Sequence, residues 1–239
     1  MSPKHIPLPE KIRPQKLIEF IGQKDIVNKE GIIYKLIKQE TKSKFFPSLI
    51  FWGPPGSGKT TLARIIAEEI NRTFYEFSAV NTSINEIKKI MPQSNNSLQK
   101  EFDFTSPIIF IDEIHRFNKA QQDALLPYVE KGQIILIGAT TENPSFEVIS
   151  PLLSRCRVIV LKQHSQEELF QIIKRGLKEL SVKLPEKALK YLAQVSNGDA
   201  RVCLNILEIA SSISKSKNIT VKNIKDALQR EQLGFDLKG

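Results

Sequence analysis

The sequence has few cysteines and no long apolar run, and each of these absences argues against a class of protein. Of its 239 residues only Cys156 and Cys203 are cysteines, and neither belongs to a C-x-x-C pair. This argues against zinc binding and a disulfide framework, and it favours a reducing, cytoplasmic setting. No apolar stretch approaches the roughly 20 residues of a membrane-spanning helix, and the opening MSPKHIPLPE has no apolar core. We therefore expect no membrane partner and no secretory signal.

Blocks of like charge are also absent, although basic residues outnumber acidic ones. The chain has 35 Lys and Arg against 26 Asp and Glu, which gives a net charge of +9. The excess is +5 over residues 1–164 and +4 over residues 165–239, and no run of five like charges occurs. A basic balance favours a nucleic-acid partner. Because the charge is so evenly spread, it supports that interpretation only weakly against a simple bias of composition.

What the sequence does contain is a glycine-rich stretch, GPPGSGKTT, between a short apolar run and a helical pattern. Glycines let the backbone bend and expose its N–H groups, and the first turn of the helix adds unpaired donors and its dipole. The spacing matches the P-loop pattern G-x-x-x-x-G-K-[ST]. Lys59 should then reach the β- and γ-phosphates of ATP, and the Thr60 hydroxyl should bind Mg²⁺. The predicted ATP-binding residues here are Gly53, Pro54, Pro55, Gly56, Ser57, Gly58, Lys59, Thr60 and Thr61.

Five short apolar runs separated by helical or polar segments predict an α/β fold, a P-loop NTPase core with a mainly parallel sheet. In such sheets ligands bind beyond the carboxyl ends of the strands. Gly53, Asp112 and Thr140 each follow a strand closely and can converge on one site. The predicted strands are Leu49–Trp52, Phe74–Phe77, Ile108–Ile111, Ile134–Ile137 and Val158–Leu161.

After Leu161 the strand signals stop and helical patterns take over. Ser165 and Glu168 form a capping box before the first of four predicted helices, and Asp199 is a candidate cap for the third. We therefore predict two domains: a nucleotide-binding core over residues 1–164, and a small all-helical lid over residues 165–239. The polar stretch QSNNSLQK, residues 93–100, is predicted to be a surface loop.

The third predicted strand ends in IIFIDE, with two acids after four apolar residues. Asp112 can complete the Mg²⁺ shell opposite Thr60, and Glu113 can orient or deprotonate an attacking water. Two acids in this place also occur as an ordinary helix cap, but the P-loop upstream favours the functional interpretation. His115 follows closely; a lone histidine at the start of a helix is more often structural or interfacial, so it is not placed in the catalytic set.

GPPGSGKTT together with IIFIDE resembles the AAA+ ATPases. Four further stretches are more specific: IDEIHRFNKAQQDALLPYVEKG, IGATTENPSFEV, LLSRCRV and NGDARVCLNILE. These, and the opening IRPQKLIEFIGQ, resemble the family of replication-associated recombination protein A. Its members are bacterial relatives of the Werner-helicase-interacting protein, in the clamp-loader-like group. The resemblance runs from about Leu8 to Gln232.

The resemblance implies further site residues. Arg155 looks like the arginine finger that acts on ATP held by a neighbouring subunit, a contribution worth ~10³–10⁵ in rate in NTPases that use one. Arg201 resembles the lid arginine of sensor 2, which touches the γ-phosphate. Sensor 1 resembles Thr140 or Thr141, with Asn143 as the rival. The segment beside the adenine resembles Ile12, Arg13, Ile21 and Gly22.

The resemblance also implies a function: Mg²⁺-dependent, DNA-stimulated ATP hydrolysis at subunit interfaces, in DNA replication, recombination and repair at stalled forks. The expected partners are DNA with single-strand/double-strand junctions and fork proteins such as single-strand-binding protein, in the cytoplasm with the nucleoid. Family members continue into a C-terminal helical domain that builds a homotetramer. This sequence stops at GFDLKG, before the expected position of that domain, so the resemblance leaves its own oligomeric state open.

Two other functions fit the same fold. An ATP-gated assembly module, as in some clamp-loader subunits, would bind ATP without significant turnover. Such subunits often lack part of the catalytic set, whereas this chain keeps Lys59, Asp112, Glu113, Arg155 and Arg201. A protein unfoldase would need an aromatic–apolar–glycine pore loop, but residues 78–106 contain no Gly, Tyr or Trp. Hydrolysis linked to DNA is therefore the preferred hypothesis.

Overall fold

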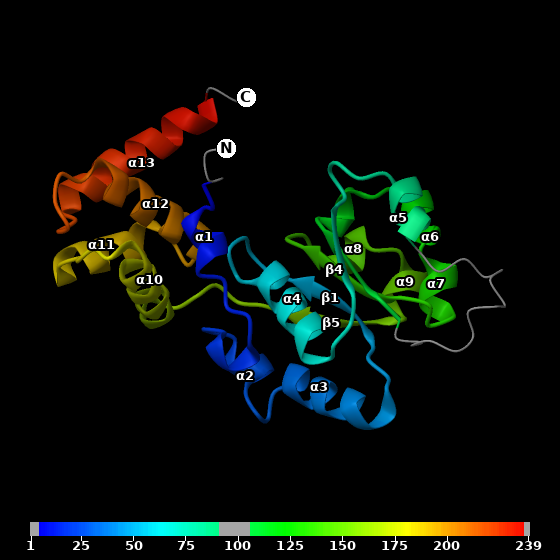
Figure 1. Ribbon diagram of the computed structural model, residues 1–239. Helices are drawn as coiled ribbons and strands as arrows, with labels where there is room; N and C mark the ends of the chain where they lie inside the picture. The colour runs from blue at the N-terminus through cyan, green and yellow to red at the C-terminus, as the bar shows by residue number, and fades with distance from the viewer. Residues whose placement is uncertain (1–4, 91–105, 237–239) are drawn as a thin grey trace.

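The computed structural model describes residues 5–90 and 106–236, with the backbone alone from residue 230 on. The loop predicted over residues 93–100 lies outside this part of the chain. Within it, a sheet flanked by helices is followed by a bundle of four longer helices, and the two units lie side by side (Figure 1).

The sheet has five strands, and every paired strand is parallel to its neighbour. The order across the sheet is β2-β3-β4-β1-β5, so the strand before the P-loop lies in the interior. This confirms the predicted α/β core. The strands are β1 (Ser48–Trp52), β2 (Phe74–Ser78), β3 (Ile108–Asp112), β4 (Ile135–Thr140) and β5 (Cys156–Val160).

Alternation along the strands divides the core into two layers. Leu49 and Phe51 of β1 face the cluster made with α3 (Ile32–Ser43) and α4 (Lys59–Glu69), while Ile50 faces the opposite cluster. That second cluster includes buried residues of α5 (Ile84–Ile90), η2 (Ile114–Arg116) and α9 (Ser150–Leu153). Both faces of the central strands are covered, which is why those strands read as continuous apolar runs. Further short helices are α6 (Lys119–Asp123), α7 (Leu126–Glu130) and α8 (Pro144–Glu147).

The fourth strand differs from its predicted bounds, because it runs on through Gly138 and Ala139 to Thr140. Backbone pairing with β1 decides this, since Trp52 is the partner of Thr140. A Cβ at Gly138 would lie 2.8 Å from Ile50 Cδ1 and 2.9 Å from Ile114 Cδ1, so a larger residue there would force those side chains to shift. A glycine at such a close approach is typical of a strand that packs tightly against its neighbours.

The helical unit packs four helices around its own apolar core. The predicted capping box opens the first helix: Ser165 Oγ accepts from the backbone N–H of Glu168 at 3.2 Å, and Glu168 Oε2 accepts from that of Ser165 at 3.0 Å. Asp199 caps the third helix, as predicted. The helices are α10 (Gln166–Leu180), α11 (Glu186–Val195), α12 (Ala200–Ile213) and α13 (Val221–Asp236).

The N-terminal segment ties the two units together. Leu8 of α1 (Leu8–Lys11) is buried in the core of the helical unit, and its backbone N–H donates to Glu208 Oε2 at 3.0 Å. Two residues on, Glu10 pairs with Arg64 of α4 at 2.7 Å. Two short elements follow: η1 (Leu17–Glu19) and α2 (Lys24–Val27). The domain division at residue 164 stays a prediction, and the helical unit's core also takes in residues from the start of the chain.

Among the helices that the structure describes, none combines the length and the apolar character needed to cross a bilayer.

The two cysteines are predicted to be inert in the folded chain. Burial raises the pKa of the Cys156 thiol, and that of Cys203, to about 12 from a usual 9.0. A rise of three units lowers the reactive thiolate roughly 10³-fold near neutral pH. Alkylation of both thiols at pH 8 should therefore be slow in the native protein and fast in denaturant. Mass spectrometry of the alkylated protein over time measures both rates. Rapid native labelling of either cysteine would contradict this burial.

Candidate functional site

The two units meet around an open cleft of about 1010 Å³ at the carboxyl edge of the sheet. One wall is the P-loop and the end of β3; the other is formed by α10 and the start of α12. The segment from Pro9 to Ile21 closes one end. A cleft at the carboxyl ends of parallel strands is the usual place for a ligand in an α/β protein.

The P-loop bends through two glycines with positive φ, Gly56 at 67° and Gly58 at 96°. Residues other than glycine rarely adopt either of these backbone conformations. Gly58 then forms the N-cap of α4, whose first residues Lys59, Thr60 and Thr61 line the cleft. The loop thus presents a helix N-terminus to the cleft, which is the arrangement that binds phosphate.

The Lys59 side chain lies within the loop itself. Its ammonium donates to the carbonyls of Gly53 at 2.7 Å and Pro54 at 2.9 Å, and the residue is only 8% exposed. Burial lowers the pKa of Lys59, and the carboxylates of Asp112 and Glu113 act in the opposite direction. The predicted loop residues are therefore brought together. Pro55 to Thr61 line the cleft, and Gly53 and Pro54 lie behind them as acceptors.

Asp112 and Glu113 also line the cleft, directly after β3. Glu113 has left-handed backbone angles, φ 55° and ψ 44°, and its N–H donates to Asp112 Oδ1 at 3.2 Å. Hydroxyl and carboxylate oxygens are the ligands that Mg²⁺ prefers. The Asp112 carboxylate and the Thr60 hydroxyl, across the same cleft, fit that requirement as a pair.

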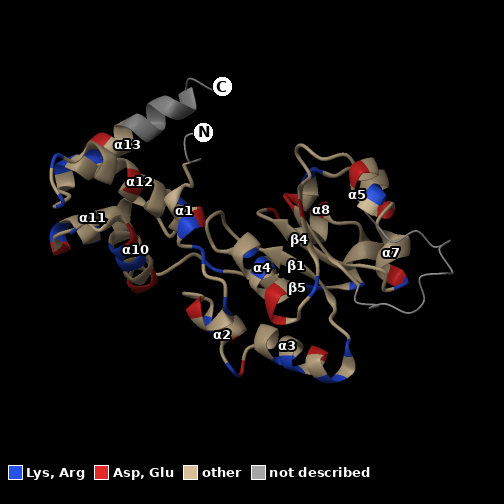
Figure 2. Ribbon diagram, viewed as in Figure 1, with Lys and Arg blue, Asp and Glu red and all other residues tan. Residues whose placement is uncertain are grey.

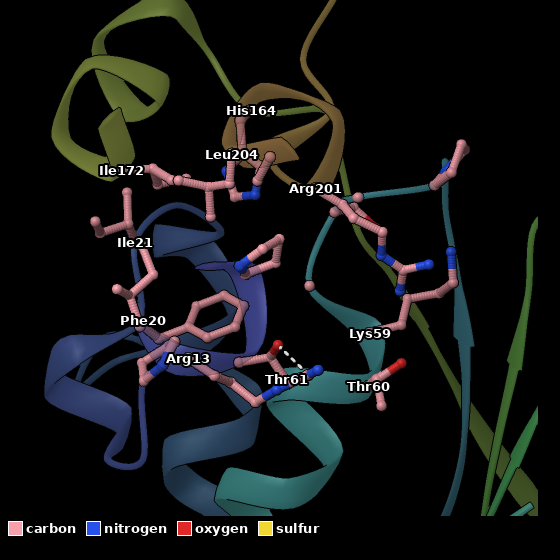
Figure 3. A pocket seen from close by; sticks show the side chains of 18 of the residues that line it. Arg13, Phe20, Ile21, Lys59, Thr60, Thr61, His164, Ile172, Arg201 and Leu204 are labelled. Atoms are coloured by element: carbon pink, nitrogen blue, oxygen red, sulfur yellow. Dashed lines mark hydrogen bonds between the residues drawn. The ribbon is translucent and has the colours of Figure 1, made fainter. Parts of the chain in front are cut away.

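The helical unit reaches the P-loop through the N-terminus of α12. Asp199 Oδ1 accepts from the backbone N–H of Arg201 at 2.8 Å and of Val202 at 3.0 Å. A Cβ added at Gly56 would lie 2.0 Å from the same oxygen, so only glycine fits there. Arg201 follows this cap and lines the cleft near Lys59, as Figure 3 shows. Burial is the main cause that lowers the pKa of Lys59, and the charge of Arg201 acts in the same direction.

The opposite end of the cleft is apolar (Figure 3). Of the predicted adenine-side residues, Ile12, Arg13 and Ile21 line it, and Arg13 donates to Thr61 Oγ1 at 2.9 Å. Gly22 does not line it; a Cβ there would lie 2.8 Å from His164 Nδ1. Sequence reasoning missed eight of the lining residues, because their helical spacing or isolation carries no signal for a ligand site. They are Pro9, Pro14, Phe20, His164, Ile172, Arg175, Ala200 and Leu204.

The three sensor-1 candidates lie behind the cleft wall, outside the residues that line it. Thr140 is fully buried at the end of β4, and its hydroxyl is 3.0 Å from His115 Nδ1. Asn143 instead caps α8, accepting from the backbone N–H of Ser145 at 3.0 Å. His115 therefore lies between the hydroxyl of Thr140 and the Glu113 carboxylate, and it contacts both. Which of Thr140, Thr141 and Asn143 senses the nucleotide stays a prediction.

Arg155 lies outside the cleft of its own chain. Its guanidinium pairs with Glu130 Oε1 at 2.7 Å and donates to the Pro151 carbonyl at 2.7 Å, and its side chain is 39% exposed. The structure therefore does not bring it to the other predicted catalytic residues within one chain.

His164 is buried where the P-loop, Gly22 and α10 meet. Its side chain is 3% exposed, and Nδ1 is 3.4 Å from Glu168 Oε2. Among the described residues, Nδ1 has no partner with hydrogen-bond geometry. Burial lowers the pKa of His164, while Glu168 and Asp199 oppose the shift.

Comparison with known families covers both units. The family described as "ATPase family associated with various cellular activities (AAA)" matches residues 49–164, and the AAA C-terminal domain matches residues 178–239. The chain is 43% identical over 244 residues to replication-associated recombination protein A of Haemophilus influenzae, covering 98% of this chain and 53% of that protein. It is 40% identical over 259 residues to ATPase WRNIP1 of Dictyostelium discoideum, covering 98% and 29%.

The chain spans about half the length of the bacterial relatives it matches; for the Escherichia coli protein of the same name the share is 53%, at 38% identity over 98% of this chain. Among solved structures it is similar to the Holliday junction branch migration motor RuvB of Thermotoga maritima. The TM-score is 0.74 at 28% identity, covering 91% of this chain and 72% of that one. The K64R mutant of that protein gives a TM-score of 0.75 at 28% identity, covering 92% and 73%.

Acid is predicted to weaken the fold through His164. Its pKa is lowered by burial, so the unfolded chain binds the proton more readily. The contribution of neutral His164 is therefore complete above the unfolded pKa of 6.5 and decreases as the pH falls below it. Melting temperatures from pH 8 to 5 should fall more steeply for wild type than for His164→Gln.

His5 supplies the control, since its side chain is 80% exposed. The His5→Gln variant should follow the wild-type curve. Parallel curves for wild type and His164→Gln would show that burial of His164 does not govern the acid response.

Proposed function

The chain belongs to the AAA ATPases, in the family of replication-associated recombination protein A, and from that premise we propose that it binds and hydrolyses ATP in DNA replication, recombination or repair. One observation carries the proposal: Lys59, the two acids after β3, and Arg201 of the helical unit all face one cleft. A phosphate-binding loop, a water-activating acid and a lid cation are the parts that phosphoanhydride hydrolysis requires.

The phosphates bind at the P-loop and the base at the apolar end of the cleft. Loop N–H groups and the α4 N-terminus supply fixed positive dipoles. Lys59 exchanges its carbonyl partners, which lie in the same loop at 2.7 and 2.9 Å, for phosphate oxygens. Phe20, Ile21 and Leu204 line the apolar end, where they can sandwich the adenine. Arg13, held to Thr61, lies between the two ends.

Thr60 and Asp112 would hold a Mg²⁺ ion, which would neutralise phosphate charge there. Glu113 accepts a proton from the attacking water and aligns it with the γ-phosphate. Arg201 approaches from the opposite wall, so closure of the helical unit over the cleft adds a positive charge where negative charge accumulates. Each of these side chains lines the cleft, which supports the assignment.

Arg155 completes the site of a neighbouring subunit. Its exposure and its position outside its own cleft support action in trans. We therefore propose a homo-oligomer with the ATP at subunit interfaces. The chain spans about half the length of its bacterial relatives, so the oligomeric state of the whole protein is part of this proposal.

DNA is the proposed partner, especially junctions of single and double strands at stalled forks, with fork proteins such as single-strand-binding protein. The support comes from the relatives, and from RuvB as a branch migration motor on Holliday junctions. The net charge of +9 and the spread of Lys and Arg over both units (Figure 2) are consistent with contacts to phosphate. The cytoplasm, with the nucleoid, is the proposed location.

Phosphate release from ATP tests this function directly. We expect turnover by the chain that rises when DNA with a single-strand/double-strand junction is added. The Lys59→Ala variant should lose tight ATP binding, because it removes the ammonium that would bind the phosphate oxygens. Lys190→Ala, which removes an exposed lysine of α11, is the matched control and should behave as wild type.

The outcomes separate the candidate functions. ATP that binds tightly with no phosphate release, with or without DNA, would favour an ATP-gated assembly module. A turnover rate that is the same with and without DNA would contradict the proposal that DNA is a partner. Unchanged ATP affinity in Lys59→Ala would remove the P-loop from the nucleotide site.

Mixing two inactive variants tests the finger in trans. The turnover rate should fall by a factor on the order of 10² or more in each variant. Arg155→Ala removes the proposed arginine finger, and the amide of Glu113→Gln cannot accept the proton from water. Together they should recover part of it, since some interfaces combine an intact cleft with an intact Arg155.

Arg157→Ala is the control for this mixture, because it removes an exposed arginine two residues along on β5. Its turnover should stay within about twofold of wild type. A mixture that forms mixed oligomers without regaining turnover would place Arg155 outside the active site.

A further inference from the structure

His115 connects two segments that both end at the cleft. It is the second residue of η2, and its side chain is 9% exposed. Its Nδ1 is 3.0 Å from Thr140 Oγ1 at the end of β4, and its Nε2 is 3.2 Å from Glu113 Oε2. The ring therefore spans the space between the proposed water-activating carboxylate and a buried hydroxyl of the neighbouring strand.

The proton positions follow from what each partner can donate. An ionised carboxylate only accepts hydrogen bonds, so Nε2 carries the proton that it gives to Glu113. Thr140 Oγ1 already accepts from the backbone N–H of Glu142 at 3.0 Å. Its own hydrogen can go to Nδ1 of a neutral ring at 3.0 Å or to the carbonyl of Glu142 at 3.3 Å, and the contact with Nδ1 is the shorter of the two. The chain of bonds runs from the Thr140 hydroxyl through His115 to Glu113.

The contact also fixes which oxygen of Glu113 is free. The contact with His115 Nε2 is made through Oε2 of Glu113. Oε1 is left for the water. Glu113 has a left-handed backbone and a side chain that is 30% exposed, so a contact that holds the carboxylate helps to define its direction.

We propose that His115 is a positioning residue for Glu113, and that it links the direction of the carboxylate to Thr140 at the end of β4. The inference rests on the proposed ATP hydrolysis. A group that orients a general base reduces the free energy needed to align that base with its substrate. Removing such a group is therefore expected to lower kcat while leaving the Kd of the substrate unchanged.

Two substitutions separate positioning from packing. His115→Phe keeps an aromatic ring and removes both polar contacts; His115→Gln keeps a donor for Glu113. We expect kcat to fall roughly 10- to 100-fold in His115→Phe, with the Kd for ATP and the melting temperature close to wild type. His115→Gln should recover most of the loss. Arg116→Ala, at the next position of η2, is the control and should keep wild-type kcat.

A double-mutant cycle tests the link to β4. Thr140→Val should lower kcat by itself and add little in the His115→Phe background, because both changes break one chain of bonds. Full kcat in His115→Phe, or equal losses in His115→Phe and His115→Gln, would overturn the proposal while leaving ATP hydrolysis intact.

A second readout does not depend on turnover. Nitrogen-15 NMR of the imidazole should show a proton on Nε2 of His115, with its resonance shifted by Glu113→Gln and by Thr140→Val. A ring protonated on Nδ1 alone would contradict the proposed bonds. If the wild-type chain proves unable to hydrolyse ATP, the proposed function fails, and this spectrum still decides whether His115 holds Glu113.

Discussion

The shared carboxyl edge of the parallel sheet is the constraint on which the rest of the site depends. Trp52 of β1 is paired with Thr140 of β4, and the N–H of Gly53 donates to the Thr140 carbonyl at 3.1 Å, so the P-loop starts where β4 ends. Pairing of β3 with β4 brings Asp112 to the same edge. Because parallel strands all end on one side, segments distant in sequence meet there without any need for local signals.

The helical unit completes the site by packing so close to the P-loop that one position of the loop must be glycine. Asp199 caps α12 and would collide with any side chain at Gly56. From the other side, Leu8 is buried in the helical core, and Arg13 bonds to Thr61 at the start of α4. The conformation of the loop and the position of the lid are thus coupled.

Apolar periodicity predicted the order and type of the core elements well, because β1 and β3 are continuous apolar runs that stop at Gly53 and Asp112. It ended β4 too early, since nothing local marks Gly138 as strand; pairing with β1 makes it so. His115 was set aside because a single histidine carries little signal. Its partner Thr140 is 25 residues away, and only the packing of η2 against β4 brings them together.

The sequence by itself determined the phosphate-binding loop, the acids after β3, the helix caps and the alternation of strands and helices. These depend on φ/ψ preferences and hydrogen bonds within a few residues, which residue type and spacing encode directly. The tertiary structure decided that Phe20, Ile172, Arg175 and Leu204 face the cleft, and that Arg155 does not. Those outcomes depend on how two separately packed units dock, and a helical repeat looks the same whether it faces a core or a cleft.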